Sequence, residues 1–500
     1  MTRHVRRMYI PCMDKTILVP AERELFSVIA QAALANPFSP EREVLDRRIV
    51  GAGREVQRDD LYRRVAKGVA EAVRRLNANG RASQRLYSGR DRELVRKVAL
   101  FDVYHRYRGA FDAYIRQQIT HGDTPCAVPF GRELLTALAD LDFKTDEALR
   151  YLAIFSQMRR AFYFIETTLT GLSPSMQSLR RHLWNNIFTS DIGRYEALLW
   201  DRMEDFSTLL LGETGTGKGA AAAAIGRSGY IPFDPGRGTF SESFTRNFIS
   251  LNLSQFPETL IESELFGHKK GSFTGAIGDH TGVFSRCTPH GSIFLDEIGD
   301  LSIPAQIKLL QILQERNFVP VGSHERQRFH GRVIAATHKP LDAMRRAGLF
   351  RDDFYYRLCS DIVTMPSLRQ RLHEDPRELD ALVDGILRRL LGPQGGELTD
   401  FVGAAILRSV PADYPWPGNV RELEQAVRRI LVTSDYRGEP PATATDAQQR
   451  LLFAINDGTL NAQQLLTSYC HLLYRRHGTY EEVARLTNLD RRTVKKYLTN

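Results

Sequence analysis

A glycine-rich segment near the middle of the 500-residue chain has the residue types of a phosphate-binding loop. It fits the pattern GxxxxGK, follows the apolar run Leu209–Leu211 and precedes an alanine-rich helical stretch. Glycines let backbone N–H groups surround phosphate oxygens, and Lys218 would neutralise the β- and γ-phosphates. We therefore predict ATP binding by the consecutive residues Gly212, Glu213, Thr214, Gly215, Thr216, Gly217, Lys218 and Gly219.

Two neighbouring carboxylates end a second apolar run, Ser292-Ile-Phe-Leu-Asp296-Glu297. The residue after Lys218 is Gly219, so the Ser or Thr hydroxyl that usually binds Mg²⁺ is missing from the loop. We expect Asp296 to hold Mg²⁺ together with phosphates and water, and Glu297 to polarise the water that attacks ATP. The alternative is a buried strand followed by a solvated acidic turn.

The elements around these motifs are predicted from apolar patterning. Short β-rich runs at 208–211, 248–253, 292–295 and 332–336 alternate with helical stretches, which favours a parallel α/β sheet. The region before them is mostly helical. There Tyr104, Tyr107, Phe111 and Tyr114 recur at helical spacing, and we expect them to fill a core between helices rather than to bind a ligand.

The end of the chain has the pattern of a helix–turn–helix. A helix over 480–486, a turn at 487–490 and a second helix over 491–498 would share apolar inner faces. Side chains of the second helix would contact DNA bases and phosphates. The predicted DNA-binding residues are Arg491, Arg492, Thr493, Lys495 and Lys496. A helical hairpin with a basic face is the alternative.

Charge and composition limit the class of protein. The net charge is +9; residues 1–100 hold 21 basic and 12 acidic residues, and residues 471–500 hold 7 and 3. Basic ends suggest a polyanion partner, although a solvated basic face explains many such clusters. The five cysteines lie far apart, and no apolar run approaches the ~20 residues that span a bilayer. We expect a cytoplasmic, nucleoid-associated protein without a membrane partner.

The chain resembles a known family, the bacterial enhancer-binding proteins that activate sigma-54 RNA polymerase. The resemblance covers roughly 170–432, and less specifically 461–500. It rests on motifs in the family's order: Glu262-Ser-Glu-Leu-Phe-Gly-His268, Gly271-Ser-Phe-Thr-Gly-Ala276, Phe294-Leu-Asp-Glu-Ile-Gly299, Ala335-Ala-Thr-His338, Phe350-Arg-Asp-Asp-Phe-Tyr-Tyr-Arg-Leu358 and Trp416-Pro-Gly-Asn-Val-Arg-Glu-Leu423. It implies an AAA+ α/β P-loop domain with a helical lid, a mostly helical N-terminal domain and a C-terminal all-α Fis-type helix–turn–helix.

The resemblance also implies roles for individual residues. Asn252 matches the switch residue that holds the catalytic glutamate, here Glu297, away from water. Thr337 and His338 match the sensor near the γ-phosphate, and Arg421 matches the lid arginine that contacts nucleotide. The arginine fingers, which reach the neighbouring subunit's ATP, are matched by Arg351 and Arg357.

One segment resembles the family's sigma-contact loop. It comprises Gly271, Ser272, Phe273, Thr274, Gly275 and Ala276. Glycines at both ends permit a hinge, and Phe273 and Thr274 offer an apolar and a hydrogen-bonding contact. The family usually has Ala where this chain has Ser272, a change we expect to be tolerated. Two stretches, 185–200 and 227–247, are longer than the family needs, and we interpret both as surface insertions.

We predict five regions: an N-terminal regulatory domain (1–165), the α/β ATPase subdomain (166–376), the helical lid (377–436), a linker (437–460) and the helix–turn–helix (461–500). The predicted function is a sigma-54-dependent activator that couples ATP hydrolysis to remodelling of the RNA polymerase holoenzyme while bound to double-stranded DNA, as a ring-shaped oligomer expected to be a hexamer. The alternatives are a chaperone-like AAA+ remodeller and a DNA-binding repressor with a vestigial ATPase.

Overall fold

The structure, a computed structural model, describes residues 15–411, 413–434, 436, 451–452, 454–455 and 460–499. Contacts divide the chain into two compact units. The first comprises Met1–Gly403 and Tyr414–Val427, and the second comprises Ala404–Asp413 and Arg428–Asn500. Within the described residues, no helix has the length and apolar character needed to cross a membrane.

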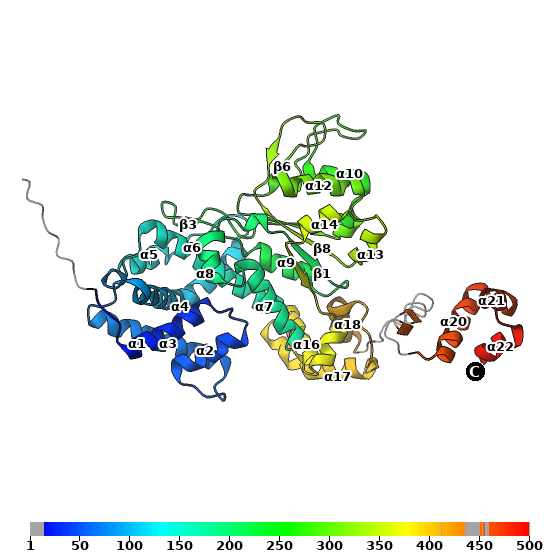
Figure 1. Cartoon of the computed structure of the whole chain (residues 1–500), viewed down its shortest axis with the longest axis horizontal. Coiled ribbons are helices and arrows are strands. Elements are labelled where there is room, and N and C mark those ends of the chain that lie inside the picture. Colours follow the sequence, from blue (N-terminus) through cyan, green and yellow to red (C-terminus); the bar gives the residue numbers. More distant parts are fainter. Residues whose placement is uncertain are drawn as a thin grey trace, which may run out of the picture. The chain divides into compact units, whose positions relative to one another are not determined.

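A five-stranded parallel sheet forms the centre of the first unit (Figure 1). Its strands, in spatial order, are β4 (Phe248–Asn252), β5 (Ser292–Asp296), β8 (Arg332–Thr337), β1 (Thr208–Leu211) and β9 (Asp361–Thr364). Because all the strands are parallel, their carboxyl ends meet at one edge of the sheet. The α/β class and four of these strands are confirmed, β4 ends one residue earlier than predicted, and β9 was not predicted.

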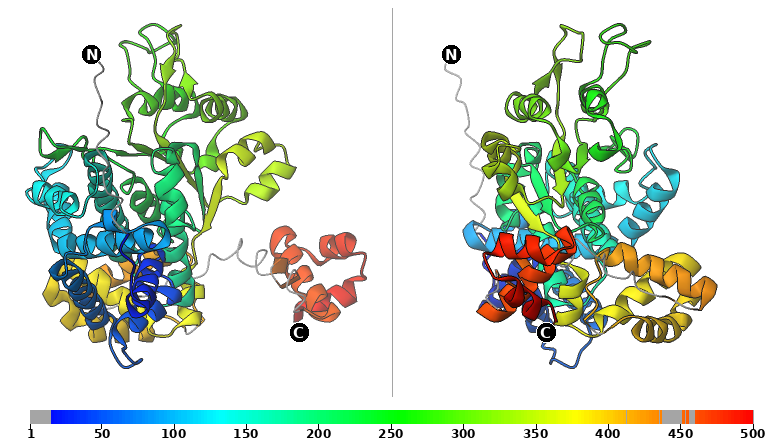
Figure 2. Two further views of the ribbon diagram at one scale, coloured as in Figure 1. Left: turned by 60° about the vertical axis from the view of Figure 1, so that its left-hand side comes forward. Right: turned by 90° about the vertical axis from the view of Figure 1, so that its right-hand side faces the viewer.

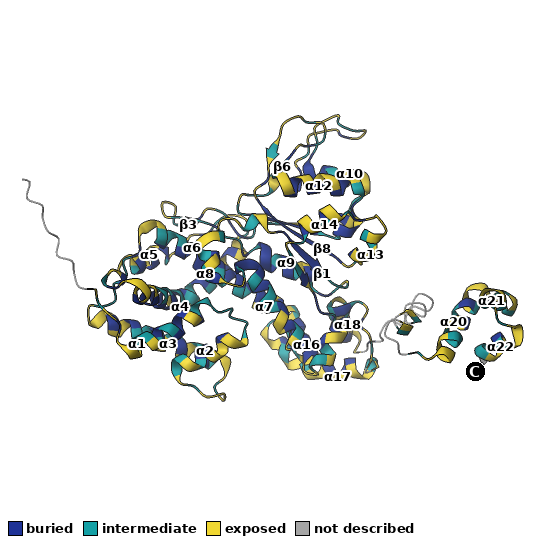
Figure 3. Cartoon of the chain, in the orientation of Figure 1, coloured by how far each residue is buried: buried dark blue, intermediate teal, exposed yellow. Residues whose placement is uncertain are grey.

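Alternation along the strands separates two apolar cores. Ile293, Leu295 and Val333 belong to one core, whereas Phe294 and Ile334 belong to the other. The buried strands β1 and β8 are dark blue in Figure 3. This burial on both faces explains why the strands are almost continuously apolar. The elements that cover the first face and its loops are η4 (Leu253–Gln255), α10 (Glu258–Phe266), α11 (Val283–Arg286), η5 (Ile298–Asp300), α12 (Ile303–Glu315), α13 (Leu341–Arg346) and α14 (Asp352–Leu358).

The second face is covered by α9 (Lys218–Gly226) and by helices that precede the sheet in sequence. The elements before the sheet are α1 (Pro20–Leu34), α2 (Pro40–Val50), α3 (Arg58–Ala78), η1 (Gln84–Leu86), α4 (Gly89–His121), α5 (Gly131–Ala139), α6 (Thr145–Thr168), α7 (Pro174–Phe188), α8 (Ile192–Arg194), the π-helical turn η2 (Tyr195–Leu199) and η3 (Met203–Asp205). In α4, Tyr107, Phe111 and Tyr114 are buried and Tyr104 packs against the same core, as predicted.

The apolar core on this second face is continuous from α4 to the sheet. It joins Phe111 of α4 and Phe164 of α6 to Ile225 of α9 and Ile334 of β8. The predicted boundary between residues 165 and 166 therefore falls inside α6 and inside a shared core. A separate cluster, built from residues between Leu18 and Phe101, holds the first four helices together.

The interpretation of 185–200 and 227–247 as surface insertions is wrong. Phe188 at the end of α7 and Tyr195 in η2 are fully buried. The second stretch contains a hairpin of β2 (Phe233–Asp234) and β3 (Thr239–Phe240), and its aromatic rings contact α4 and α6: Tyr114–Phe240 at 5.4 Å and Phe164–Phe244 at 5.7 Å. Gly, Pro, Ser and Thr suggested a solvated loop, but the interspersed aromatics supply core surface.

After the sheet the chain is helical. The elements are α15 (Leu368–Glu374), α16 (Glu378–Leu391), η6 (Pro393–Leu398), α17 (Thr399–Ser409) and α18 (Asn419–Thr433). The helices are interrupted between Ser409 and Asn419, and Trp416 and Asn419 adopt positive φ angles of 49° and 51°. A further hairpin, β6 (Asn317–Phe318) and β7 (Gln327–Arg328), extends with its neighbouring loops beyond α10 and α12 (Figures 1 and 2).

The second unit contains three helices near its end: α20 (Ala462–His477), α21 (Tyr480–Thr487) and α22 (Arg491–Thr499). Cys470, Leu473, Val483 and Val494 are buried between them. The two helices predicted at 480–486 and 491–498 are therefore confirmed. Most of the predicted linker, 437–460, lies outside the described residues.

Candidate functional site

The glycine-rich loop joins the end of β1 to the first turn of α9. Three of its glycines have positive φ angles: 158° at Gly212, 80° at Gly215 and 97° at Gly217. Gly215 also has no room for a side chain, because a Cβ atom there would lie 2.1 Å from the carbonyl oxygen of Gly418. The loop thus needs glycine for its backbone conformation and for close approach to the chain near α18.

Lys218 begins α9 and is only 7% exposed. Its Nζ donates to the carbonyl oxygens of Gly212 at 2.8 Å and Glu213 at 3.1 Å. Burial lowers the pKa of Lys218, and the nearby Glu297 and Asp296 oppose this shift. The loop therefore holds a poorly hydrated ammonium group whose hydrogen-bond partners are neutral carbonyls, an arrangement that suits a phosphate anion.

Residues of α15 and of the first turn of α18 contact the loop from the lid side. Asn419 Nδ2 donates to Glu213 Oε2 and to the Thr214 carbonyl oxygen, both at 3.1 Å. Arg369 forms a two-armed ion pair with Glu213. Although burial opposes it, these bonds from Arg369 and Asn419 lower the pKa of Glu213. Arg421 lies beside Gly215, because a Cβ atom added to that glycine would be 3.1 Å from Arg421 Cβ.

Sequence reasoning missed Arg369 and Asn419. Asn419 lies inside the Trp416–Leu423 motif, so the motif itself was the available signal. Arg369 lies in a short helix that carries no motif. Its partner Glu213 is 156 residues away in the chain, and only the folded structure brings the two together.

The two predicted carboxylates lie at the end of β5. Asp296 Oδ1 accepts the backbone N–H of Glu297 at 3.0 Å, and burial followed by the charge of Glu297 raises the pKa of Asp296. Glu297 has a φ of 57°, which is rare for a residue with a side chain. Backbone in this region is typical of functional positions where the surrounding fold enforces it.

The carboxylate of Glu297 is held by the end of β8. His338 Nδ1 lies 2.8 Å from Glu297 Oε2, and Thr337 Oγ1 donates to the same oxygen at 3.5 Å. Asn252 ends β4 directly beside Asp296, but its Oδ1 accepts from Ser254 N at 3.0 Å and Ser254 Oγ at 2.8 Å. In this structure, the sensor residues rather than the predicted switch residue hold the glutamate.

The metal prediction depends on Asp296. Among the described residues, no group of three or more His, Cys, Asp or Glu side chains is arranged to hold a metal ion. A site for Mg²⁺ would therefore need phosphate and water ligands as well as Asp296. Gly219 leaves open space nearby, because the nearest side-chain atom to a Cβ at this position, on Phe294, would be 3.9 Å away.

Arg351 directly precedes α14, and Arg357 lies in the last turn of that helix. The guanidinium of Arg351 donates to both carboxylate oxygens of Asp353, at 3.0 and 2.7 Å. That of Arg357 donates twice to the carbonyl oxygen of Leu313, at 3.0 and 2.7 Å. In the part of the chain that the structure describes, both groups are thus held by contacts outside their own glycine-rich loop.

The 271–276 loop follows α10. Gly271 N donates to the carbonyl oxygen of Ala276 at 2.9 Å, so the loop closes on itself, and Gly271 and Gly275 have φ angles of 79° and 101°. Thr274 is exposed and Phe273 is half-buried, its ring packed edge-on against His268 with the centroids 4.9 Å apart. The loop presents Thr274 to solvent.

A second loop supports the 271–276 loop. The sequence did not predict this contact. Lys269 N donates to the carbonyl oxygen of Val321, and Val321 N donates to that of Gly267, both at 2.9 Å. Ser272 packs on Gly322, where a Cβ would lie 2.5 Å from Ser272 Cβ. The connection between β6 and β7 therefore fixes the base of the 271–276 loop while leaving its tip free.

In the second unit, Asp490 caps the last helix. Its carboxylate accepts the N–H groups of Arg492 at 2.9 Å and Thr493 at 3.0 Å, while Arg491 pairs with Glu481 at 2.9 Å. Arg492 and Lys496 are exposed. The geometry places a short basic helix against a second short helix, with a four-residue buried core beneath them and α20.

Comparison with known proteins identifies one domain of the chain and several relatives. Residues 197–363 match the model of the sigma-54 interaction domain. The hydrogenase transcriptional regulatory protein HoxA of Cupriavidus necator is 41% identical over 230 residues, 46% of this chain and 44% of that protein. The regulatory protein AtoC of Escherichia coli is 35% identical over 317 residues, 60% and 64% of the two chains.

Another relative is the DNA-binding transcriptional regulator NtrC of Azospirillum brasilense, 38% identical over 262 residues, 52% of this chain and 47% of that one. The chain thus spans 44% to 64% of the length of these relatives. A crystal structure of NtrX from Brucella abortus aligns with 73% of this chain and 78% of its own at a TM-score of 0.41 and 20% identity. Residues 197–363 are a sigma-54 interaction domain of the kind found in bacterial enhancer-binding proteins, the family to which the homologues of this chain belong.

Proposed function

We propose that the protein is an ATP-hydrolysing, DNA-binding activator of sigma-54 RNA polymerase. The observation that carries the proposal is the combination, in one sigma-54 interaction domain, of a glycine-rich loop with its lysine, paired acids at the end of β5 and a projecting loop with Thr274 exposed. Such a domain can couple a chemical step at the sheet edge to a contact made elsewhere on its surface.

The glycine-rich loop and the lid would bind the nucleotide. Phosphate oxygens would replace the carbonyl partners of Lys218 Nζ and accept from backbone N–H groups at the start of α9. Arg421 lies next to Gly215 and would contact the phosphates from the lid. When bound, Mg²⁺ would neutralise phosphate charge, with Asp296 as its protein ligand.

Glu297 would act as the base that orients and deprotonates the attacking water. Its hydrogen bond to His338 supports a resting arrangement in which this carboxylate is already occupied. A γ-phosphate that attracts Thr337 or His338 would free Glu297 for water. The neighbouring position of Asn252 on β4 makes it the alternative partner for the glutamate after such a change.

Assembly would complete the site. Arg351 and Arg357 are held away from their own glycine-rich loop, which supports action on the nucleotide of a neighbouring subunit in a ring, expected to be a hexamer. Hydrolysis would then move the 271–276 loop against sigma-54. The helix–turn–helix would hold the ring on upstream DNA through Arg491, Arg492, Thr493, Lys495 and Lys496. This function implies a cytoplasmic protein associated with the nucleoid.

Two alternative functions would use the same residues differently. A chaperone-like remodeller would use the ATPase without a promoter, and the sigma-54 interaction domain favours the activator over it. A repressor with a vestigial ATPase would tolerate loss of Lys218, Asp296 and Glu297, yet all three are present and close together.

The test is a matched pair of loop variants. Thr274→Ala removes an exposed hydroxyl at the tip, and we expect it to reduce sigma-54 binding at least ~10-fold, about 1.4 kcal/mol, while ATP turnover stays near the wild-type rate. Ser272→Ala removes a hydroxyl whose oxygen is buried and has no hydrogen-bond partner among the described residues, so it should preserve both properties. Equal loss of sigma-54 binding in the two variants would contradict a contact through Thr274.

A further inference from the structure

A cavity of about 260 Å³ lies among the helices that precede the sheet, where the function proposed above assigns no ligand. Its walls come from α1, the α1–α2 connection, α2, α3 and α4 on one side and from α6 and α7 on the other. We name it the arginine–aromatic cavity after the residues that decide its chemistry: Arg42, Arg58, Arg108, Arg159, Tyr104 and Phe162.

The charge of the lining favours an anion. Four guanidinium groups line the cavity, against the carboxylates of Asp59 and Glu166. Two of the four already have acidic partners outside the lining: Arg42 pairs with Asp46 at 2.8 Å, and Arg159 pairs with Asp112 at 2.5 Å.

Neither of the other two guanidinium groups has a carboxylate within ion-pair distance among the described residues, although the charges of Glu166 and Glu43 act on Arg58 from farther away. Arg58 donates to neutral oxygens, the Pro37 carbonyl at 3.2 Å and the Tyr62 hydroxyl at 3.3 Å. Arg108 has no hydrogen-bond or ion-pair partner within the described part of the chain. A ligand carboxylate would supply both groups with an anionic partner, because its two oxygens match the planar geometry of a guanidinium.

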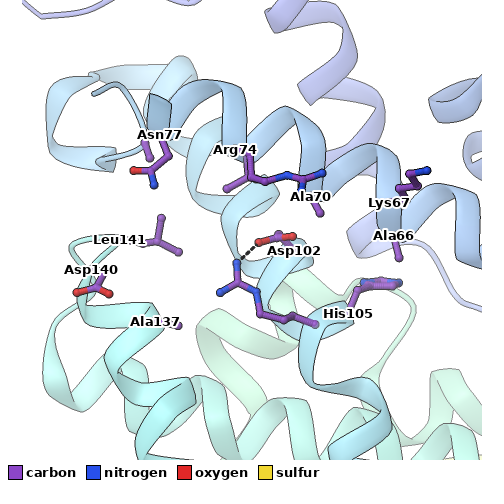
Figure 4. A pocket seen from close by; sticks show the side chains of 13 residues that line it. Ala66, Lys67, Ala70, Arg74, Asn77, Asp102, His105, Ala137, Asp140 and Leu141 are labelled. Carbon is purple, nitrogen blue, oxygen red and sulfur yellow. Dashed lines mark hydrogen bonds and ion pairs between the residues drawn. The ribbon is translucent and has the colours of Figure 1, made fainter. Parts of the chain in front are cut away.

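The surroundings of His105 show the same positive electrostatic potential. Its Nδ1 bonds the Phe101 carbonyl oxygen at 2.9 Å, and burial, reinforced by the charge of Arg42 and Arg108, lowers its pKa to about 3. The imidazole is therefore neutral at physiological pH. His105 lines both the arginine–aromatic cavity and a larger one of about 500 Å³, which Asp102 also lines (Figure 4).

Aromatic side chains in the lining indicate which chemical group the ligand carries beside its carboxylate. Tyr62, Tyr104, Phe162 and Trp184 line the cavity, and Phe162 already stacks on Phe38 with ring centroids 5.2 Å apart. Planar rings pack well against such walls. The volume is below the ~300–1,000 Å³ usual for drug-sized ligands, which limits the ligand to about one ring.

We propose that the arginine–aromatic cavity binds a small aromatic carboxylate, whose carboxylate group is received by Arg108 and Arg58 and whose ring packs against Tyr104 and Phe162. The ligand would bridge α3, which belongs to the apolar core of the first four helices, and α6, which shares its core with the ATPase sheet; α4 contributes to both cores. Binding there would change how firmly the two cores are joined, so the ligand would act as an effector of the ATPase domain.

The test measures binding to the full chain without nucleotide, so it does not depend on the proposed ATPase or on sigma-54. Benzoate and phenylacetate are titrated by calorimetry and thermal unfolding, with benzyl alcohol and benzylamine as uncharged and cationic probes. We expect at least one carboxylate to bind and to raise the unfolding temperature, and both other probes to fail. Absence of binding by both carboxylates, or equal binding of benzyl alcohol, would overturn the proposal.

Variants locate the site. Arg108→Gln and Arg58→Gln should each weaken carboxylate binding by about 10- to 100-fold, as expected for loss of a charge-assisted hydrogen bond. Arg106→Gln is the matched control, because Arg106 lies on the same helix but lines the larger cavity and pairs with Asp102 at 2.6 Å. Unchanged binding in both test variants, or equal weakening in Arg106→Gln, would place the ligand elsewhere.

Discussion

Two neighbouring residues of the candidate site divide binding and chemistry between them. Lys218 is buried and bonded to neutral carbonyl oxygens, so its charge is available to phosphate. Glu297 is held in a rare backbone conformation and bonded to His338, so its carboxylate is positioned but occupied. The two groups should therefore fail in different ways when they are replaced.

This difference gives a prediction. Lys218→Ala should weaken ATP binding by about 10- to 100-fold, because the phosphates lose a charge-assisted hydrogen bond. Glu297→Gln should bind ATP nearly as well as the wild type but hydrolyse it about 10²- to 10⁴-fold more slowly, since only the base is lost. Nucleotide titration and single-turnover hydrolysis on both variants check it. Equal loss of binding in the two would refute this division of roles.

At the level of helices and strands, an ion pair connects α7 to the sheet. His182 Nε2 on α7 lies 2.9 Å from Asp361 Oδ1 at the start of β9. The hydrogen bond to Asp361 raises the pKa of His182. A raised pKa in the folded state means that the pair stabilises the protein fully below the unfolded pKa near 6.5, and that this contribution is lost as pH rises through the folded pKa.

His182→Gln should therefore lower the unfolding temperature more at pH 5.5 than at pH 8.5. Because the His182 side chain is 41% exposed, the difference should not exceed ~1 kcal/mol. Thermal unfolding of the wild type and of the variant at the two pH values measures it. His324→Gln, at an exposed loop position, is the control and should show no such pH dependence. The same destabilisation at both pH values would mean that His182 acts by packing alone.

Sequence patterns predicted the elements that combine a motif with a strong local signal. β1, β5 and β8 are continuous apolar runs next to glycines or acids, and their burial on both faces accounts for that composition. β9 was missed because it starts and ends with the polar residues Asp361 and Thr364. The hairpin of β2 and β3 was misassigned because its turn residues outnumber the aromatics that bury it.

The residues of the candidate site divide in the same way, because some lie in local motifs and others depend on contacts across the fold. Lys218, Asp296 and Glu297 could be proposed from the sequence because their motifs are local. The partners Arg369 and His338 depend on contacts across the fold; His338 was identified only as a sensor, and its bond to Glu297 depends on the adjacency of β5 and β8. The fixed base of the 271–276 loop, provided by Val321, likewise arises from pairing between distant segments.

For the molecule as a whole, the proposed function requires an assembly. Arg357 is bonded to Leu313 rather than to its own glycine-rich loop, which fits a group that serves a neighbouring subunit. Subunits carrying Arg357→Ala keep an intact Lys218, and subunits carrying Lys218→Ala keep an intact Arg357. Neither variant alone should hydrolyse ATP at an appreciable rate.

Mixed assemblies of the two variants should regain part of the activity, because some interfaces combine an intact Arg357 with an intact Lys218. ATP turnover measured across a series of mixing ratios, with light scattering to show that mixed particles form, checks this. Mixed particles with no activity at any ratio would assign Arg357 a role within its own subunit.

The proposed activator depends above all on ATP chemistry at the sheet edge controlling a contact with sigma-54. Binding of purified sigma-54 to the wild-type chain, measured with no nucleotide, with ADP and with an ATP transition-state analogue, tests this coupling without any variant. We expect a stable complex with the analogue and much weaker binding in the other two states. A chain that hydrolyses ATP but binds sigma-54 in none of the three states would contradict the activator and favour the remodeller.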